Sequence, residues 1–137
     1  MAASNGFSIV IPVYNEEELI EKNTKRLIKF LDENKCKEYE IILADNGSAD
    51  KTKELGAKLS KIDIIKFISV AEKGPGLAFK DAILNAKYNK IISADMDLSV
   101  ELKFILKAVK LLGEYDIVVG SKITGEQKRS FFRKFPC

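Results

Sequence analysis

Two aspartates, Asp95 and Asp97, stand directly after an apolar run, with Met96 between them. In an extended segment, residues i and i+2 point to the same side, so we expect both carboxylates to face outward while Met96 turns toward the core. Two carboxylates held together repel each other unless a cation lies between them, and a purely oxygen ligand set favours Mg²⁺ or Mn²⁺. The competing interpretation is a turn in which Asp97 caps the following helix.

A third acidic residue, Asp45, ends another apolar run. The residues after it, 46–50 (NGSAD), have the composition of an Asx turn followed by a helix cap. We therefore expect these residues to build the turn. Asp45 itself we expect to be free to accept an N–H from a pyrimidine or purine base.

The segment 73–76 (KGPG) precedes a predicted helix. It is either a tight turn with proline near the helix start, or a phosphate site in which Lys73 and bare backbone amides meet the anion. The segment does not fit the GxGxxG dinucleotide pattern, because Phe79 occupies the position of the last glycine. It carries little weight alone.

The composition excludes several other chemistries. With no His among 137 residues, Ser-His and Cys-His catalysis are absent, and acid–base work falls to carboxylates or Lys. The two cysteines, Cys36 and Cys137, lie far apart without a CxxC motif, which excludes a Cys/His zinc site and favours a reducing compartment. The net charge of +3 is too small to indicate a nucleic-acid binder.

Short apolar runs alternate with amphipathic ones along the chain. The pattern predicts strands at 7–13, 40–44, 62–70, 90–94 and 116–121, and helices at 17–34, 50–60, 77–87 and 99–112. This alternation predicts parallel pairing through right-handed crossovers, and strands that are apolar throughout predict helices on both sheet faces. We expect one doubly wound α/β domain over 1–137, with a core at 7–122 and no assignment for 123–137.

In such a sheet, ligands bind beyond the carboxyl ends of the strands. The residues at those ends are polar after every predicted strand, and all five sets should lie along one edge. They include Tyr14, Asn15 and Glu16, then Asp45, then 72–74, then Asp95 and Asp97, and lastly Ser121 and Lys122.

Five motifs occur in a recognisable order: IPVYNEEE (11–18), ADNGSAD (44–50), EKGPGLAFKDAI (72–83), SADMDLS (93–99) and VVGSK (118–122). Together they resemble the family-two inverting glycosyltransferases of GT-A fold, in particular the branch that uses polyprenyl (dolichyl) phosphate acceptors. The resemblance covers about residues 7 to 134. It implies a three-layer sheet of the nucleotide-diphospho-sugar transferase type.

The resemblance also implies roles for the donor side. Pro12, Tyr14 and Glu16 would form a wall of the nucleotide pocket, Asp45 would read the base, and Lys73 would lie near the phosphates. Asp95 and Asp97 would be the catalytic DxD pair that holds Mg²⁺ or Mn²⁺ on the donor diphosphate. Because Asp97 lies further out along the strand, we expect it to be the direct ligand, and we expect Asp95 either to meet the ribose or to bind the cation through water. On the acceptor side, Lys122, Arg129 and Arg133 would meet the acceptor phosphate.

The sequence departs from the family pattern at three places. Asn46 stands where the family more often has a second Asp, and Lys122 stands where it commonly has Arg, which replaces a bidentate fork with a point charge. The chain also ends at Cys137, whereas GT-A domains usually continue much further. We therefore expect the donor half of the site to be present and the acceptor half to be missing or supplied by another chain.

The expected function is transfer of a hexose from a nucleotide-diphosphate sugar to a polyprenyl phosphate, with charge on the departing diphosphate stabilised by the cation. The alternative is a catalytically incomplete nucleotide-binding or assembly module. A response-regulator receiver domain is excluded, because Ala71 and Glu72 stand where its phosphoacceptor Asp would be. No signal peptide or membrane span is apparent, so we expect a cytoplasmic chain, peripheral at the membrane, without nucleic acid and prone to form homo-oligomers.

Overall fold

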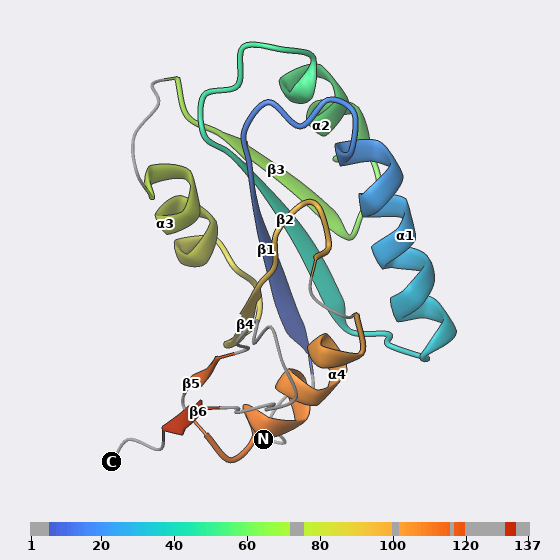
Figure 1. Ribbon diagram of the computed structural model, residues 1–137, viewed down its shortest axis with the longest axis vertical. Coiled ribbons are helices and arrows are strands. Elements are labelled where there is room, and N and C mark those ends of the chain that lie inside the picture. The colour runs from blue at the N-terminus through green and yellow to red at the C-terminus, as the bar shows by residue number, and fades with distance from the viewer. Residues whose placement is uncertain (1–5, 72–75, 100–101, 116, 120–130, 134–137) are drawn as a thin grey trace. The chain divides into compact units, whose positions relative to one another are not determined.

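A computed structural model of the chain describes residues 6–71, 76–99, 102–115, 117–119 and 131–133. The chain divides into two compact units, Met1–Ser99 and Val100–Cys137. In the first unit, strands and helices alternate as the sequence predicts (Figure 1). Its elements are β1 (Phe7–Val13), α1 (Ile20–Glu33), β2 (Tyr39–Asp45), α2 (Thr52–Leu59), β3 (Ile65–Ser69), α3 (Leu77–Leu84) and β4 (Lys90–Ser93).

The four strands of this unit form one parallel sheet in the order β3-β2-β1-β4. β1 pairs with β2 along its whole length, from Phe7 opposite Tyr39 to Val13 opposite Asp45. Its pairing with β4 is shorter and ends where Val10 lies opposite Ser93. β1 therefore extends beyond its β4 neighbour at the carboxyl end of the sheet.

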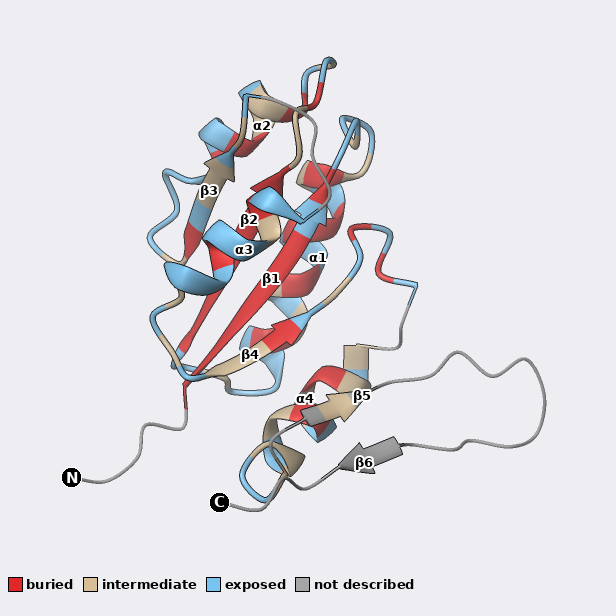
Figure 2. Ribbon diagram, turned by 90° about the vertical axis from the view of Figure 1, so that its left-hand side faces the viewer, coloured by how far each residue is buried: buried red, intermediate tan, exposed pale blue. Residues whose placement is uncertain are grey.

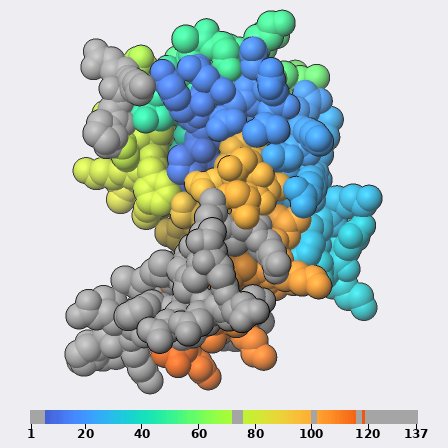
Figure 3. All heavy atoms as spheres, viewed as in Figure 1, coloured from blue at the N-terminus to red at the C-terminus, as the bar shows by residue number. Residues whose placement is uncertain are grey.

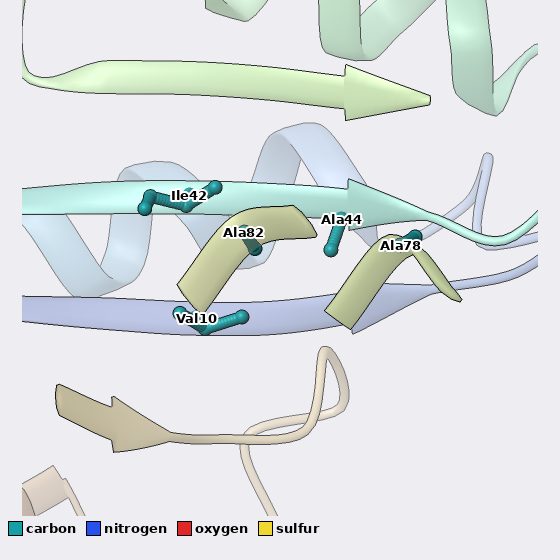
Figure 4. Packing of buried hydrophobic residues seen from close by; sticks show 5 residues of the cluster. All are labelled: Val10, Ile42, Ala44, Ala78 and Ala82. Carbon is teal, nitrogen blue, oxygen red and sulfur yellow. The ribbon is translucent and has the colours of Figure 1, made fainter. Parts of the chain in front are cut away.

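Helices cover both faces of the sheet, so the first unit has three layers, as predicted (Figure 1). α3 lies on one face, and α1 and α2 lie together on the other. Beneath α3, small side chains let the helix approach the strands closely (Figure 4). This buried cluster consists of Val10, Ile42, Ala44, Ala78 and Ala82.

The opposite face carries larger side chains. Alternation along the strands places Ile9, Ile11, Ile41 and Leu43 there, and all four are completely buried. From α1, the buried apolar side chains are Ile20, Leu27 and Leu31. Figure 2 shows β1 and β2 buried along most of their length, as expected for central strands covered on both faces.

The second unit contains α4 (Leu102–Leu111), β5 (Ile117–Val119) and β6 (Phe131–Arg133). The strand predicted at 116–121 is present, but its expected place in the parallel sheet is wrong. β5 pairs antiparallel with β6, with Val118 opposite Phe132. No strand was expected within 123–137, so β5 had no predicted antiparallel partner, although Phe131 and Phe132 are strong strand formers. Within the described residues, no helix is both long enough and apolar enough to cross a bilayer.

Candidate functional site

The topological switch point of the sheet lies between β1 and β4. From β1 the chain moves to β2 and then β3 on one side, and only afterwards crosses to β4 on the other side. In doubly wound sheets, ligands bind in the crevice outside the carboxyl ends of the strands at this point. The candidate site is therefore built from the residues after β1, β2 and β4.

Pro12 lies just beyond the point where the pairing between β1 and β4 ends, and a proline suits that position. The Ala94 N–H donates to the Val10 carbonyl at 3.1 Å, so Val10 makes the last bond between the two segments. Backbone groups facing one neighbour recur at every second residue, and the next such position is Pro12, which has no N–H to leave unpaired. Pro12 is exposed, as a wall of the predicted pocket would be.

Hydrogen bonds tie the segment after β1 to the segment after β2. The Asn15 N–H donates to Ser48 Oγ at 2.8 Å, and Asn15 Oδ1 accepts the Ala49 N–H at 2.9 Å. The Glu16 N–H donates to Thr52 Oγ1 at 2.8 Å. These bonds hold Asn15 at φ +50°, a conformation that Asn tolerates better than most residues. They fix the backbone from which Tyr14 and Glu16 project.

Asp45 lies at this edge, but its carboxylate is not free, and that expectation was wrong. The residue is completely buried. Its Oδ2 accepts from Ser69 Oγ at 2.8 Å, and its Oδ1 accepts from the Ser48 hydroxyl and from the Ser48 N–H. Ser69 ends β3, so parallel pairing brings this donor beside Asp45. The expected turn after Asp45 is present, with Gly47 at φ +78° and Asp50 accepting the Thr52 N–H at 2.8 Å.

The Asp95–Asp97 segment is a tight turn after β4. The Leu98 N–H donates to the Asp95 carbonyl at 3.0 Å, and Asp97 Oδ1 accepts the Ser99 N–H at 3.0 Å. Met96 is only 2% exposed, whereas Asp95 and Asp97 are both exposed, which confirms the predicted alternation. Asp97 supports the backbone at Ser99, and the predicted cap of the following helix stays a prediction, because residues 100 and 101, which precede α4, lie outside the described residues. The turn nevertheless presents two carboxylates to solvent.

Glu16 connects the two sides of the switch point. Partial burial raises the pKa of the Glu16 carboxyl, and the negative charges of Asp97 and Asp50 raise it further. A carboxylate whose charge is opposed in this way is stabilised when a cation binds nearby. Figure 3 shows the segment after β4 (yellow-orange) lying against the segment around the start of α1 (blue). The structure thus brings the first and fourth motifs together.

These carboxylates fit a divalent cation only in part. They supply the hard oxygen atoms that Mg²⁺ and Mn²⁺ prefer. Among the residues that the structure describes, however, no group of three or more His, Cys, Asp or Glu side chains could hold a metal ion by itself. Mg²⁺ commonly takes only one or two carboxylates and completes its shell with water and phosphate oxygens. The arrangement therefore fits a cation that binds together with a diphosphate.

For several predicted site residues, the structure gives little or no description of the side chain. Tyr14, two residues before Glu16 in the chain, is 41% exposed. Lys73, Lys122 and Arg129 lie outside the described residues. Arg133 ends β6 in the second unit, and the structure describes its backbone alone. The expected phosphate roles of these basic residues stay predictions.

Sequence reasoning named Asn15 as a strand-end residue and Ser48 as a turn residue, but it missed three other side chains that fix the site. Thr52 and Ser69 help to hold the loops after β1 and β2, and Asn23 of α1 donates from Nδ2 to the Met96 carbonyl at 2.8 Å. Small polar residues next to strand ends are the signal that could have identified the loop residues. The helical spacing of Ile20, Leu27 and Leu31 places Asn23 on the buried side of α1, but no local pattern identifies its partner, which lies 73 residues away.

Comparison with known proteins gives this edge a context. The chain is 32% identical over 130 residues to the uncharacterized glycosyltransferase YkcC of Bacillus subtilis, covering 93% of this chain and 40% of the relative. It is 34% identical over 137 residues to the undecaprenyl-phosphate 4-deoxy-4-formamido-L-arabinose transferase of Proteus mirabilis, covering 95% of this chain and 40% of that protein. It therefore spans less than half the length of these relatives.

A solved structure supports the fold. The structure of S. aureus TarS residues 1–349 in complex with UDP-GlcNAc matches with a TM-score of 0.62 at 22% identity, covering 81% of this chain and 32% of the TarS 1–349 chain. This similarity supports the α/β architecture of GT-A type. The model of the family described as glycosyl transferase family 2 matches residues 8–136. With five ordered motifs, this match and a sheet whose switch point gathers the first, second and fourth of them, the chain belongs to glycosyl transferase family 2.

Proposed function

We propose that the chain binds a nucleotide-diphosphate sugar at the carboxyl edge of β1, β2 and β4. The observation that carries this proposal is the proximity of Glu16 and Asp97, in which the Asp97 charge contributes to the raised pKa of Glu16. Acidic side chains from two segments, 81 positions apart in the printed sequence, converge at the switch point of the sheet. This is where doubly wound sheets bind ligands.

In this proposal, Pro12, Tyr14 and Glu16 line one wall of the nucleotide pocket. Asp45 reads the base. Because Ser48 and Ser69 already donate to its carboxylate, a base N–H would have to replace one of these hydroxyl donors or share an oxygen with it. Each carboxylate oxygen accepts more than one hydrogen bond, but Asp45 is completely buried, so the side chains that cover it would have to move before a base could reach it.

Asp95 and Asp97 would hold Mg²⁺ or Mn²⁺ together with the donor diphosphate, with Asp97 as the direct ligand and Asp95 near the ribose. When bound, such a cation supplies positive charge to the diphosphate that departs in the reaction. The turn contributes preorganisation, because Met96 and Leu98 are buried on either side of Asp97 and hold its backbone in place.

For the acceptor we propose a polyprenyl phosphate, and for the donor sugar a hexose. The names of two relatives support the acceptor: the undecaprenyl-phosphate transferase of Proteus mirabilis and the dolichyl-phosphate beta-glucosyltransferase of Mus musculus, which is 27% identical over 93% of this chain and 45% of its own length. A phosphate oxygen of the acceptor would form the new bond to the anomeric carbon while the bond to the nucleoside diphosphate breaks with inversion. Lys73, Lys122, Arg129 and Arg133 would hold the anions.

A phosphate monoester acceptor is already anionic at neutral pH, so the reaction needs no general base from the protein. This agrees with a chain that contains no His. Because a polyprenyl acceptor resides in a bilayer, we propose that the protein works at the cytoplasmic surface of a membrane.

Calorimetry with UDP and GDP, each in chelator and in MnCl₂, tests the donor site. We expect one of the two nucleotides to bind more tightly in Mn²⁺. Radiolabelled UDP- or GDP-hexose with undecaprenyl phosphate then tests transfer. Absence of binding by either nucleotide, in either condition, would show that the proposed donor site is wrong.

A second candidate is a nucleotide-binding or assembly module that does not turn over by itself. The chain spans about 40% of the length of its two bacterial relatives. Turnover separates the two proposals, because nucleotide binding alone fits both. Transfer to the lipid phosphate by the purified chain supports the enzyme, whereas nucleotide binding without transfer supports the module.

A further inference from the structure

One buried contact joins α1 to the turn that carries Asp95 and Asp97. Asn23 is only 5% exposed, and its Nδ2 donates to the Met96 carbonyl at 2.8 Å. Only the amino group of an amide side chain can donate to a carbonyl oxygen, so the chemistry fixes the orientation of the Asn23 amide. The acceptor is the peptide group that directly precedes Asp97.

Asn23 is an unexpected residue in this position. It lies inside α1, where Asn is a poor helix former, and it faces the protein interior, where a polar side chain must find a partner. Its neighbour Thr24 is completely buried, and the Thr24 hydroxyl has no hydrogen-bond partner among the described residues. Burial of a polar residue on this helix therefore does not by itself create a bond, and the bond of Asn23 is specific to Met96.

The turn needs such support because its backbone is unusual. Leu98 has φ +50°, a left-handed backbone conformation that residues with bulky side chains rarely adopt. Three contacts hold the turn: the bond from the Leu98 N–H to the Asp95 carbonyl, the bond from the Ser99 N–H to Asp97 Oδ1, and the bond from Asn23. The bond from Asn23 comes from another element, α1, and ties the turn to that helix.

We propose that Asn23 is the positioning residue of this turn. By fixing the Met96 carbonyl, its amide sets the orientation in which Asp95 and Asp97 face the cation and the diphosphate. This inference rests on the proposed function. It assigns to Asn23 the role that groups behind metal ligands have elsewhere, where their loss lowers metal affinity by about tenfold to a hundredfold.

The test measures coupling between metal and nucleotide in the full chain. UDP and GDP are titrated in chelator and in MnCl₂, for the wild-type chain and for Asn23→Asp, which keeps the shape of the side chain but replaces the donor with an oxygen. We expect affinity in chelator to be unchanged and the Mn²⁺-dependent gain to fall about tenfold or more. Should Asn23→Asp fail to fold, Asn23→Ser serves instead, since it leaves room for a water to bond Met96.

Thr24→Val is the matched control. It changes the adjacent buried residue of the same helix, removes a hydroxyl without a partner, and should leave the Mn²⁺-dependent gain as in the wild-type chain. Thermal unfolding of each variant is recorded in parallel. A merely structural role for Asn23 would lower thermal stability and weaken binding equally in chelator and in Mn²⁺, and that result would overturn the proposal.

A double-mutant cycle tests the route through Asp97. In the Asp97→Asn background, Asn23→Ser should have no further effect on the Mn²⁺ dependence, because the group it positions has lost its charge. If the wild-type chain shows no Mn²⁺-dependent gain, the proposed cation site and this inference both fail. If it does and the Asn23 variants keep the full gain, the inference about Asn23 alone is wrong.

Discussion

Ser69 Oγ donates to Asp45 Oδ2 at 2.8 Å, joining the ends of two neighbouring strands, β3 and β2. With the Ser48 hydroxyl and N–H on the other oxygen, the completely buried Asp45 carboxylate is satisfied within the protein. A residue expected only to read a base therefore also holds together the edge on which the base would lie. Structural and binding effects at Asp45 must be separated experimentally.

Two substitutions at Asp45 separate those effects. Asp45→Ala should weaken nucleotide binding, and it should also lower the free energy of unfolding by about 1–3 kcal/mol, because it removes the acceptor of the buried Ser48 hydroxyl. Asp45→Asn keeps one acceptor oxygen and should fold better while still binding nucleotide less tightly. Urea unfolding and calorimetry measure the two effects. Ser69→Ala is the control, and nucleotide affinity equal to wild type in Asp45→Asn would contradict the base-reading role.

Glu40 anchors the opposite end of the sheet and should make stability depend on pH. Burial by itself raises its pKa, but hydrogen bonds from Ser8, the Lys87 N–H and Lys66 outweigh burial and hold the pKa below its ordinary value. The ionised form therefore favours the folded state. Its contribution is complete above the pKa of the unfolded chain, about 4.3, and is lost as the pH falls through the lower folded value.

We expect Glu40→Gln to lower the free energy of unfolding at pH 7 by about 1–3 kcal/mol and to flatten its dependence on acid pH. Urea unfolding between pH 7 and acid measures both. Glu33→Gln is the matched control, because Glu33 is 63% exposed and lies 4.0 Å from Lys29 in a surface pair. Such pairs contribute about 0–1 kcal/mol. An equal loss of unfolding free energy in both variants would show that the buried hydrogen bonds of Glu40 stabilise the fold no more than a surface pair does.

Ala82 tests the close approach of α3 to the sheet. It is completely buried in the cluster with Val10, Ile42, Ala44 and Ala78 (Figure 4). Ala82→Leu should push α3 away from the strands and lower the free energy of unfolding by about 1–3 kcal/mol. Lys80→Leu places the same side chain on an exposed position of α3 and should change stability little. Thermal unfolding of the two variants measures the difference. Equal unfolding temperatures would contradict the close packing of α3 against the sheet at Ala82.

Glu16 should show a conflict between stability and binding. The charges of Asp97 and Asp50 add to its raised pKa, so ionised Glu16 weakens the folded state without ligand. Glu16→Gln should therefore raise the unfolding temperature slightly at neutral pH. It should also reduce the Mn²⁺-dependent gain in nucleotide affinity, because one negative charge facing the cation is lost. Differential scanning calorimetry and nucleotide titration measure the two changes, and a lower unfolding temperature would refute the repulsion.

The positions of the core strands were predictable because each has a local sequence signal, a short run of apolar residues. The strand expected at 7–13 has those bounds in the structure, since a run that is apolar throughout occurs where both sheet faces are covered. The first helix was predicted three residues too early. Residues 17–19 are apolar or acidic like a helix start, but the Leu19 and Ile20 N–H groups both donate to the Glu16 carbonyl in a turn before α1 begins.

The contacts within the site were less predictable, because they depend on which strands become neighbours. Asp45 looked free in the sequence, and the Ser69 that binds it is 24 residues away. The side chain of Asn23 has its partner outside its own helix, because it is buried against the Met96 carbonyl, 73 residues away. Single-sequence patterns report periodicity and turn chemistry, whereas these bonds are set by tertiary packing.

Asp97 provides the sharpest prediction for the proposed cation site. Its carboxylate is exposed, interacts electrostatically with Glu16, and accepts a hydrogen bond from the Ser99 N–H. Two carboxylates alone hold Mg²⁺ or Mn²⁺ weakly, so the diphosphate must supply further oxygens, and metal and nucleotide should each raise the affinity of the other by the same factor. Asp97→Asn keeps an oxygen for Ser99 but loses the charge.

Asp97→Asn should therefore abolish the Mn²⁺-dependent gain in nucleotide affinity while metal-free binding and the unfolding temperature stay nearly unchanged. Asp95→Asn should have a smaller effect on the gain, because we assign Asp95 to the ribose or to a water-mediated contact. Calorimetric titration of UDP and GDP in chelator and in MnCl₂ measures both variants. If nucleoside diphosphate binds the wild-type chain equally well in chelator and in Mn²⁺, the Asp95–Asp97 turn is only a support for the backbone at Ser99, and the cation site fails with it.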